Sequence, residues 1–285
     1  MTIGSEFHQD LKSFWKRHDG TLSALDVGSW AATIDLTHNL YRGMPAAFNR
    51  FFAFWQYRAI RKLLQACPPR FGERVLDLGC GTGRWSRLFQ NLGASTVGID
   101  LGTHALRWAF QLSSSGSWVA MEIPRLGFRD ASFDWAVSVT VLQHLPHESQ
   151  EEALRETRRV LQPGGRLIAM ELCGGSEEGF YVFPRPRMEW EDLFSRHGFQ
   201  VVRRQASERI PWIPFFRCLA RWKPGGGEKG RRPLVEWASA WLRRGHTGLL
   251  LYLFLAIGYP LEGLAAAIGL DRWARYTAWL LRRRD

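Results

Sequence analysis

Several features that mark secreted, metal-binding or membrane-spanning proteins are scarce in this sequence. Its four cysteines are widely separated and form no Cys-x-x-Cys pair, so neither a disulfide framework nor a structural zinc site is expected. Residues 1–20 carry charges of both signs and no apolar run, which is not the composition of a secretory signal. The uncharged run 247–261 has fifteen residues, fewer than the roughly 20 that a membrane-spanning helix needs. We therefore expect a reducing, cytoplasmic compartment.

The sequence does contain enough apolar residues for a core, and its charge is unevenly distributed. Of its 285 residues, 46% are hydrophobic and 23% are charged, which excludes an intrinsically disordered chain. Lys and Arg number 38 against 27 Asp and Glu, a net charge of +11. From residue 200 onward there are 16 against 6, a net of +10, which leaves +1 for residues 1–199. The basic C-terminal third predicts contact with an anionic partner.

Patterns typical of strands and of helices alternate along the middle of the chain. Short apolar runs predict strands at 74–78, 95–99, 117–121, 135–139, 166–172 and 200–204. Helical spacing of apolar residues predicts helices at 51–65, 84–92, 103–112, 149–161 and 189–197. This alternation favours an α/β fold with a mostly parallel sheet and helices on both faces.

A glycine-rich turn follows the first predicted strand. Residues 76–83 read Leu-Asp-Leu-Gly-Cys-Gly-Thr-Gly, and such glycines let the backbone approach a ligand while the next helix offers free amides. The residue three positions after Gly81 is Arg84, so the dinucleotide pattern fails. Asp77 stands two residues before the first glycine, and Asp100 ends the next strand, where an acid can accept both hydroxyls of a ribose. The pattern favours a nucleoside ligand without a pyrophosphate.

With these residues the sequence resembles the class I S-adenosylmethionine-dependent methyltransferases, particularly the group with the motif V-L-D-x-G-C-G-T-G. The resemblance extends over residues 51–207. It includes Val-Gly-Ile-Asp at 97–100, the segment from Phe133-Asp134 to Leu-Gln-His-Leu at 142–145, and Leu-Gln-Pro-Gly-Gly-Arg-Leu at 161–167. It implies a Rossmann-like, seven-stranded sheet, S-adenosylmethionine as cofactor and methyl transfer as activity.

The resemblance also implies which residues hold the cofactor. Asp77 would order the turn and the methionine ammonium group, and Asp100 would bind the ribose. Glu122 stands where the family usually has an Asp beside the adenine. The implied cofactor-binding residues are Asp77, Gly79, Cys80, Gly81, Gly83, Asp100, Leu101, Glu122, Ile123 and Val139.

Candidate catalytic residues lie just beyond the fourth and fifth predicted strands. Methyl transfer from a sulfonium is an in-line displacement, so it depends mainly on positioning and requires neither a nucleophilic residue nor a metal. His144 is the candidate general base for an oxygen nucleophile, and the alternative is that it caps its loop or contacts cofactor. His144 and His147 form an H-x-x-H pair without a further ligand, so no metal site is predicted. Glu171 and Cys173 are either pocket residues or structural ones.

The segment after the fifth strand is a candidate for binding the acceptor. Residues 179–187 are rich in aromatic residues and arginines, and loops at the carboxyl ends of parallel strands form the ligand crevice. We expect Tyr181, Arg185 and Arg187 to contact substrate, the arginines through a carboxylate or phosphate group. An ordinary solvated loop is the alternative.

The C-terminal part departs from the alternating pattern. By the resemblance, residues 276–281 form a last, antiparallel strand beside the sixth, which makes 211–270 a helical insertion whose apolar run is expected to break at Gly258-Tyr259-Pro260. The insertion is either a lid over an apolar acceptor or a contact with the membrane interface through Trp237, Trp241, Tyr259 and nearby arginines. Both interpretations favour a small or lipophilic acceptor, with oxygen as the target atom. The expected divisions are an N-terminal segment that covers cofactor or substrate, the methyltransferase core, the insertion, and the last strand with a basic tail: 1–50, 51–210, 211–270 and 271–285.

Other partners and another class of function are also compatible with parts of the sequence. Arginine pairs interleaved with tryptophans occur in nucleic-acid-binding proteins, but the most apolar part of the chain lies between them, so nucleic acid is not expected. The alternative to an enzyme is a non-catalytic, membrane-associated module that keeps the cofactor fold. The expected location is the cytoplasm, with the inner membrane face as the alternative. The sequence leaves the acceptor's identity and the oligomeric state open.

Overall fold

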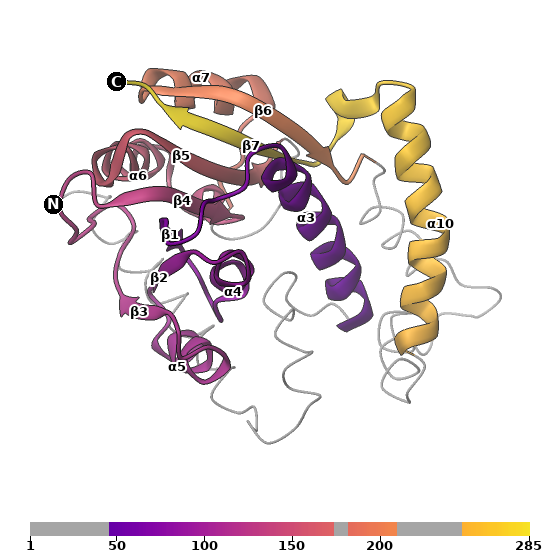
Figure 1. The fold of residues 1–285 in the computed structure, drawn as a ribbon. Coiled ribbons are helices and arrows are strands. Elements are labelled where there is room, and N and C mark those ends of the chain that lie inside the picture. Colours follow the sequence, from indigo (N-terminus) through magenta and orange to yellow (C-terminus); the bar gives the residue numbers. More distant parts are fainter. Residues whose placement is uncertain (1–45, 174–181, 210–246) are drawn as a thin grey trace, which may run out of the picture. The chain divides into compact units, whose positions relative to one another are not determined.

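The computed structural model describes residues 46–173, 182–209 and 247–285 (Figure 1). These residues divide into two compact units. The first holds residues 60–173, 182–205 and 277–285 of the described chain, and the second holds 46–59, 206–209 and 247–276.

A seven-stranded mixed sheet forms the centre of the first unit. Its strand order is β3-β2-β1-β4-β5-β7-β6, and the pairs β3/β2, β2/β1, β1/β4 and β4/β5 are parallel (Figure 1). This confirms the expected fold class, and β7 lies beside β6 as expected. The strands are β1 (Arg74–Leu78), β2 (Ser95–Asp100), β3 (Ser117–Ala120), β4 (Phe133–Val139), β5 (Leu161–Leu172), β6 (Phe199–Ser207) and β7 (Tyr276–Arg283).

Helices cover both faces of the sheet because strand residues alternate between the faces. Leu76 of β1 belongs to a buried cluster with Leu154 and Trp190 from two of the helices, whereas Phe89 from another helix lies 5.9 Å from the ring of Trp135 in β4. The cluster therefore fills one side of the sheet, and Phe89 packs on the other. The helices are α3 (Ala46–Ala66), α4 (Arg84–Asn91), α5 (Thr103–Leu112), α6 (His147–Val160) and α7 (Arg187–Arg196), with a 3-10 turn η3 (Leu142–His144).

Strand β5 begins five residues earlier than the sequence pattern predicts. Phe133 of β4 pairs with Leu161, but Trp135, only two residues on, pairs with Arg166. The intervening Pro-Gly-Gly sequence is therefore held as a bulge inside the strand, with Gly164 at a φ of 72°. The motif at 161–167 therefore lies inside β5, which begins directly after α6.

In the second unit, helix α10 (Thr247–Ala267) continues through Pro260, so the predicted break at residues 258–260 is wrong. A proline removes one amide donor and crowds the carbonyl four residues earlier, which bends a helix of 21 residues without necessarily ending it. A 3-10 turn η5 (Leu270–Trp273) follows. The rest of the expected insertion, 211–246, and most of the expected N-terminal segment lie outside the described residues. Across the described ranges, no helix combines the length and the apolar character that crossing a membrane requires.

Candidate active site

The glycine turn between β1 and α4 has a backbone that favours glycine at three positions. Gly79, Gly81 and Gly83 have φ values of 63°, 53° and 76°, in the left-handed region. A Cβ atom at Gly79 would lie 2.7 Å from both Cγ atoms of Val141, so the turn and the loop after β4 are in direct contact there. A Cβ atom at Gly81 would meet nothing within 4 Å, which leaves open space beside the backbone. Cys80 is buried between them, and burial raises the pKa of its thiol.

Asp77 fixes the start of the helix that follows the turn. Its Oδ2 accepts hydrogen bonds from the backbone N of Ser86 at 2.9 Å and from the Ser86 hydroxyl at 2.6 Å. Burial raises the pKa of Asp77 to about 7, although both hydrogen bonds oppose the rise. These contacts hold the first turn of α4, and the ordering of the glycine turn that the resemblance implies stays a prediction.

Asp100 joins the end of β2 to the glycine turn. Its Oδ2 accepts a hydrogen bond from the backbone N of Gly81, and its Oδ1 accepts one from Gly102 N, both at 2.8 Å. Leu101, between these residues, is half-buried.

The loop after β3 carries the expected adenine contacts. The backbone N of Met121 donates to the carbonyl of Asp100 at 3.1 Å, which places this loop beside the end of β2. Glu122 follows and is half-buried, whereas Ile123 is buried and belongs to the same hydrophobic cluster as Leu76. Ile123 therefore also contributes to the core.

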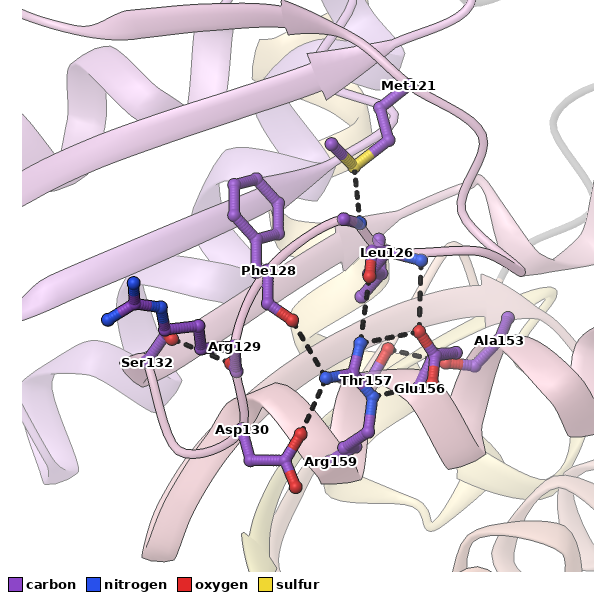
Figure 2. Close-up of polar contacts among 11 residues, drawn as sticks. Met121, Leu126, Phe128, Arg129, Asp130, Ser132, Ala153, Glu156, Thr157 and Arg159 are labelled. Atoms are coloured by element: carbon purple, nitrogen blue, oxygen red, sulfur yellow. Dashed lines mark hydrogen bonds and ion pairs between the residues drawn. The ribbon is translucent and has the colours of Figure 1, made fainter.

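An arginine from α6 holds the continuation of this loop (Figure 2). Arg159 Nη1 donates to the carbonyl of Phe128 at 2.8 Å and to Asp130 Oδ1 at 2.7 Å, and its Nη2 donates to the carbonyl of Leu126 at 2.8 Å. Both Arg159 Nε and Nη2 also donate to Glu156, which in turn accepts the backbone N of Leu126. All five N–H donors of the Arg159 guanidinium thus bond to this loop or to Glu156, and we call this set of contacts the Arg159 clamp.

His144 lies in η3, immediately beyond the end of β4. Val139 at the strand end is buried, and Thr140 has a φ of 57°, an uncommon value for a residue other than glycine. The His144 side chain is half-buried, with its Nε2 3.5 Å from Nε2 of Gln143, and its backbone N donates to the carbonyl of Val141. The contact between Val141 and Gly79 brings this loop next to the glycine turn.

Glu171, at the end of β5, holds the His144 loop through its backbone, a role that sequence reasoning missed. Its Oε1 accepts from Leu142 N and Ser138 Oγ at 3.2 Å and from Val141 N at 3.5 Å, and its Oε2 accepts from Gln143 N at 3.1 Å. Burial raises the pKa of Glu171 to about 8, against these hydrogen bonds. An acid at the carboxyl end of the apolar run 167–172 is the signal that could have indicated it.

The expected acceptor-binding residues are placed unequally. Tyr181 lies outside the described residues. Arg185 is buried and its Nε donates to Gln150 Oε1 at 2.6 Å, so this side chain holds its own loop. Arg187 is half-buried at the start of α7, close enough to Cys173 to lower the pKa of that thiol, which burial raises to about 12 overall.

These residues share one edge of the sheet. The parallel register sets Leu78 beside Ile99 and Ser138, and Val139 beside Met170, so the carboxyl ends of β1, β2, β4 and β5 meet there. A surface hollow lined by Gly164, Arg166, Gln200, Val201, Val202 and Arg282 involves the beginnings of β5 and β6 and is separate from this edge. Within the described ranges, no three His, Cys, Asp or Glu side chains are grouped as metal ligands would be.

Comparison with known proteins identifies the domain at this edge. The profile of the family described as "Methyltransferase domain" matches residues 76–169, from the glycine turn to β5. Residues 76–169 form a class I S-adenosylmethionine-dependent methyltransferase domain. The cofactor of this methyltransferase domain is S-adenosylmethionine, and the open space beside the backbone of Gly81 fits such a ligand.

Similar proteins include methyltransferases named for different acceptors. The chain is 32% identical over 161 residues to a malonyl-[acyl-carrier protein] O-methyltransferase of Pseudescherichia vulneris, covering 54% of this chain and 61% of that protein. It is 33% identical over 153 residues to a ubiquinone/menaquinone biosynthesis C-methyltransferase of Pseudomonas savastanoi, and the match covers 50% of this chain and 55% of that protein. The chain thus spans little more than half the length of these curated relatives. The crystal structure of 1,6-didemethyltoxoflavin-N1-methyltransferase from Burkholderia thailandensis shares the fold of the methyltransferase domain. Its TM-score is 0.56 at 16% identity, and the match covers 100% of this chain and 92% of that chain.

Proposed function

We propose that this chain transfers the methyl group of S-adenosylmethionine to a small or lipophilic acceptor, at an oxygen atom. The observation that carries the proposal is the convergence of the glycine turn, Asp100 and the His144 loop at one sheet edge. The similar proteins are named for an O-methyl transfer to malonyl-acyl carrier protein and for a C-methyl transfer in quinone biosynthesis, so they support the reaction class more strongly than the target atom.

The cofactor-binding role proposed for each residue follows from its place at that edge. The backbone of Gly79 and Gly81 would hold the methionine part, because a side chain at Gly79 would strike Val141 and the space beside Gly81 is open. Asp100, at the end of β2, would accept the ribose hydroxyls, because an acid at this position can bind both of them. Glu122 and Ile123 would flank the adenine, with Leu101 and Val139 as apolar neighbours and Asp77, Cys80 and Gly83 shaping the turn.

Catalysis would rest on positioning and on one proton transfer. The cofactor supplies an electrophilic methyl group on a sulfonium. The β4 loop would hold the acceptor oxygen in line with that methyl group, since geometry is the main requirement of a displacement. His144 would remove the proton of an acceptor hydroxyl, and its ring could adopt either tautomer for this task.

The acceptor and the location complete the proposal. Tyr181 and Arg187 would contact the acceptor, and Arg185 would shape the same loop from its buried position beside Gln150. We assign the protein to the cytoplasm, with membrane contact as an additional property that is argued below from α10. A small or lipid-linked acceptor is compatible with both locations.

Calorimetric titration of S-adenosylmethionine into the full chain tests the cofactor site. Asp100→Asn should weaken binding about 10- to 100-fold, because it removes one charged acceptor of the ribose, worth about 1.5–3 kcal/mol. Asp192→Asn, on the surface of α7, is the matched control and should bind as the wild type does. Equal affinity in wild type and Asp100→Asn would overturn the assignment of Asp100.

Turnover on a panel of acceptors then separates the two classes of function. Hydroxyl, carboxyl and carbon acceptors, soluble and lipophilic, are offered with labelled methyl donor. Methylation of an oxygen supports the proposal, and methylation of carbon corrects the target atom. Tight cofactor binding without turnover on the whole panel would favour the non-catalytic module.

A further inference from the structure

Helix α10 turns its single charged residue toward the protein and a row of large apolar residues toward solvent. Gly258, Glu262 and Ala265 are buried, at a spacing that places them on one face. Another row of apolar residues, spaced by four, three and four residues, is exposed to solvent. We call it the α10 stripe, and it consists of Ile257 (56% exposed), Leu261 (40%), Leu264 (58%) and, directly after the helix, Ile268 (64%).

Polar and aromatic contacts within the second unit fix this orientation. Glu262, 1% exposed, accepts the backbone N of Arg209 at 3.1 Å and lies 3.6 Å from Arg209 Nη1. Arg209 also donates from Nε to Asp271 at 2.6 Å. On the adjoining side of the helix, Tyr259 stacks on Trp55 with ring centroids 6.1 Å apart. Rotating α10 to hide the stripe would expose or unpair a buried charge, which is costly.

The C-terminal end of the stripe carries residues typical of a membrane interface. Trp273 is 66% exposed, and the guanidinium of Arg272 lies 5.4 Å from its ring. Arg275 follows two residues later, so two arginines stand close to this tryptophan in the sequence. Exposed tryptophan beside arginine suits the headgroup level of a bilayer, where the ring is half wet and the cation meets phosphate.

We propose that the α10 stripe docks on an anionic lipid surface, with α10 lying in the interface and Trp273, Arg272 and Arg275 at the headgroups. A helix without a polar outer face is normally covered, and a contiguous apolar row of this kind marks an interaction site. Anionic lipid complements Arg272 and Arg275, and the exposed ring of Trp273 suits the headgroup level, which favours a lipid surface over a second copy of the chain. This docking is independent of the proposed methyl transfer.

Vesicle flotation of the full chain tests the docking. Phosphatidylcholine vesicles with and without phosphatidylglycerol are compared at low and high salt. We expect binding to the anionic vesicles that weakens with salt, and at least about tenfold weaker binding for Leu264→Gln/Ile268→Gln, because two apolar side chains leave the interface. Phe110→Gln is the matched control: Phe110 is 60% exposed on α5 and should be replaceable without effect.

Three outcomes would overturn the proposal. The first is flotation of the double variant as strongly as the wild type, and the second is absence of wild-type binding to anionic vesicles. The third is that the wild type forms a concentration-dependent dimer in light scattering, does not bind vesicles, and loses the dimer in the double variant. That result would assign the stripe to contact with a second copy of the chain. Both changed residues are exposed, so the double variant should fold and keep its affinity for S-adenosylmethionine. Loss of docking is therefore distinguishable from loss of the cofactor site.

Discussion

Replacing Glu171 by Gln is the sharpest test of how the His144 loop is held. Glutamine keeps the shape of the side chain but cannot ionise, so it is the neutral counterpart of a group that is completely buried and accepts hydrogen bonds from three amides and one hydroxyl. Burial raises the pKa of Glu171 from 4.5 to about 8. The amide nitrogen of glutamine cannot accept a hydrogen bond, whereas both oxygens of Glu171 accept N–H groups, so the variant loses at least one of these bonds at every pH.

The sign of the pH effect follows from that shift. Between pH 4.5 and 8 the folded chain retains a proton that the unfolded chain has released, so the contribution of Glu171 to stability is fully present below pH 4.5 and is lost as the pH rises toward 8. At about 1.4 kcal/mol per unit, the full loss is at most about 5 kcal/mol. The free energy of unfolding of Glu171→Gln relative to the wild type should thus rise by about 3–5 kcal/mol between pH 5 and pH values above 8.

Urea unfolding of both proteins across this pH range measures the difference directly. Asp77 is unchanged, so its own titration cancels. Glu152→Gln, an exposed position on α6, is the control and should show no pH-dependent difference. Above about pH 8, where the wild-type carboxyl is ionised, the same Glu171→Gln change should lower turnover with little change in cofactor affinity, because the loop amides then lose their charged acceptor. A stability difference that stays constant with pH would refute the reasoning.

Two further substitutions test neighbouring contacts. His144→Ala should lower turnover on an oxygen acceptor by about 10²- to 10⁴-fold, the usual worth of a general base, with S-adenosylmethionine affinity retained; unchanged turnover would remove the base role. Arg159→Met should lower the free energy of unfolding by about 1–2 kcal/mol, a figure discounted because the Arg159 side chain is 30% exposed, and calorimetry should show Tm lower by about 2–6 °C. Arg155→Met, on the exposed side of α6, is its control, and equal melting of both variants would show that the clamp adds nothing.

The sheet and the glycine turn were predictable because they depend on local patterns. β1 and α5 begin and end at the predicted residues, since period-two and helical spacing are read over a few neighbours. The bulge at Gly164 was not predictable in this way. It depends on the pairing of β5 with β4, and a Pro-Gly-Gly sequence has the same appearance in a turn and in a bulge.

In the candidate site, too, the residues in local motifs were predictable, whereas contacts between distant parts of the chain were not. Asp77 and Asp100 were indicated by their positions next to glycines in a motif. Glu171 binds amides 28 to 30 residues earlier in the chain, and nothing in the residues around it records those partners. Arg185 shows the converse, because an arginine in an aromatic loop suggests an anionic ligand, yet its Nε is committed to Gln150.

Asp77 and Glu171 have the same structural role at two strand ends, where each holds the segment that follows a strand. Each is a buried carboxyl that accepts backbone amides from the element following a strand, and burial raises the pKa of both, to about 7 and about 8. By the sign worked out above, both should destabilise the fold as the pH rises from about 4 to 8. Apolar residues of similar size would avoid that loss, but they could not accept the amides at the start of α4 and of the His144 loop. The loss of stability at higher pH is therefore best explained by the need for fixed loops at this edge, where ligand positioning depends on backbone geometry.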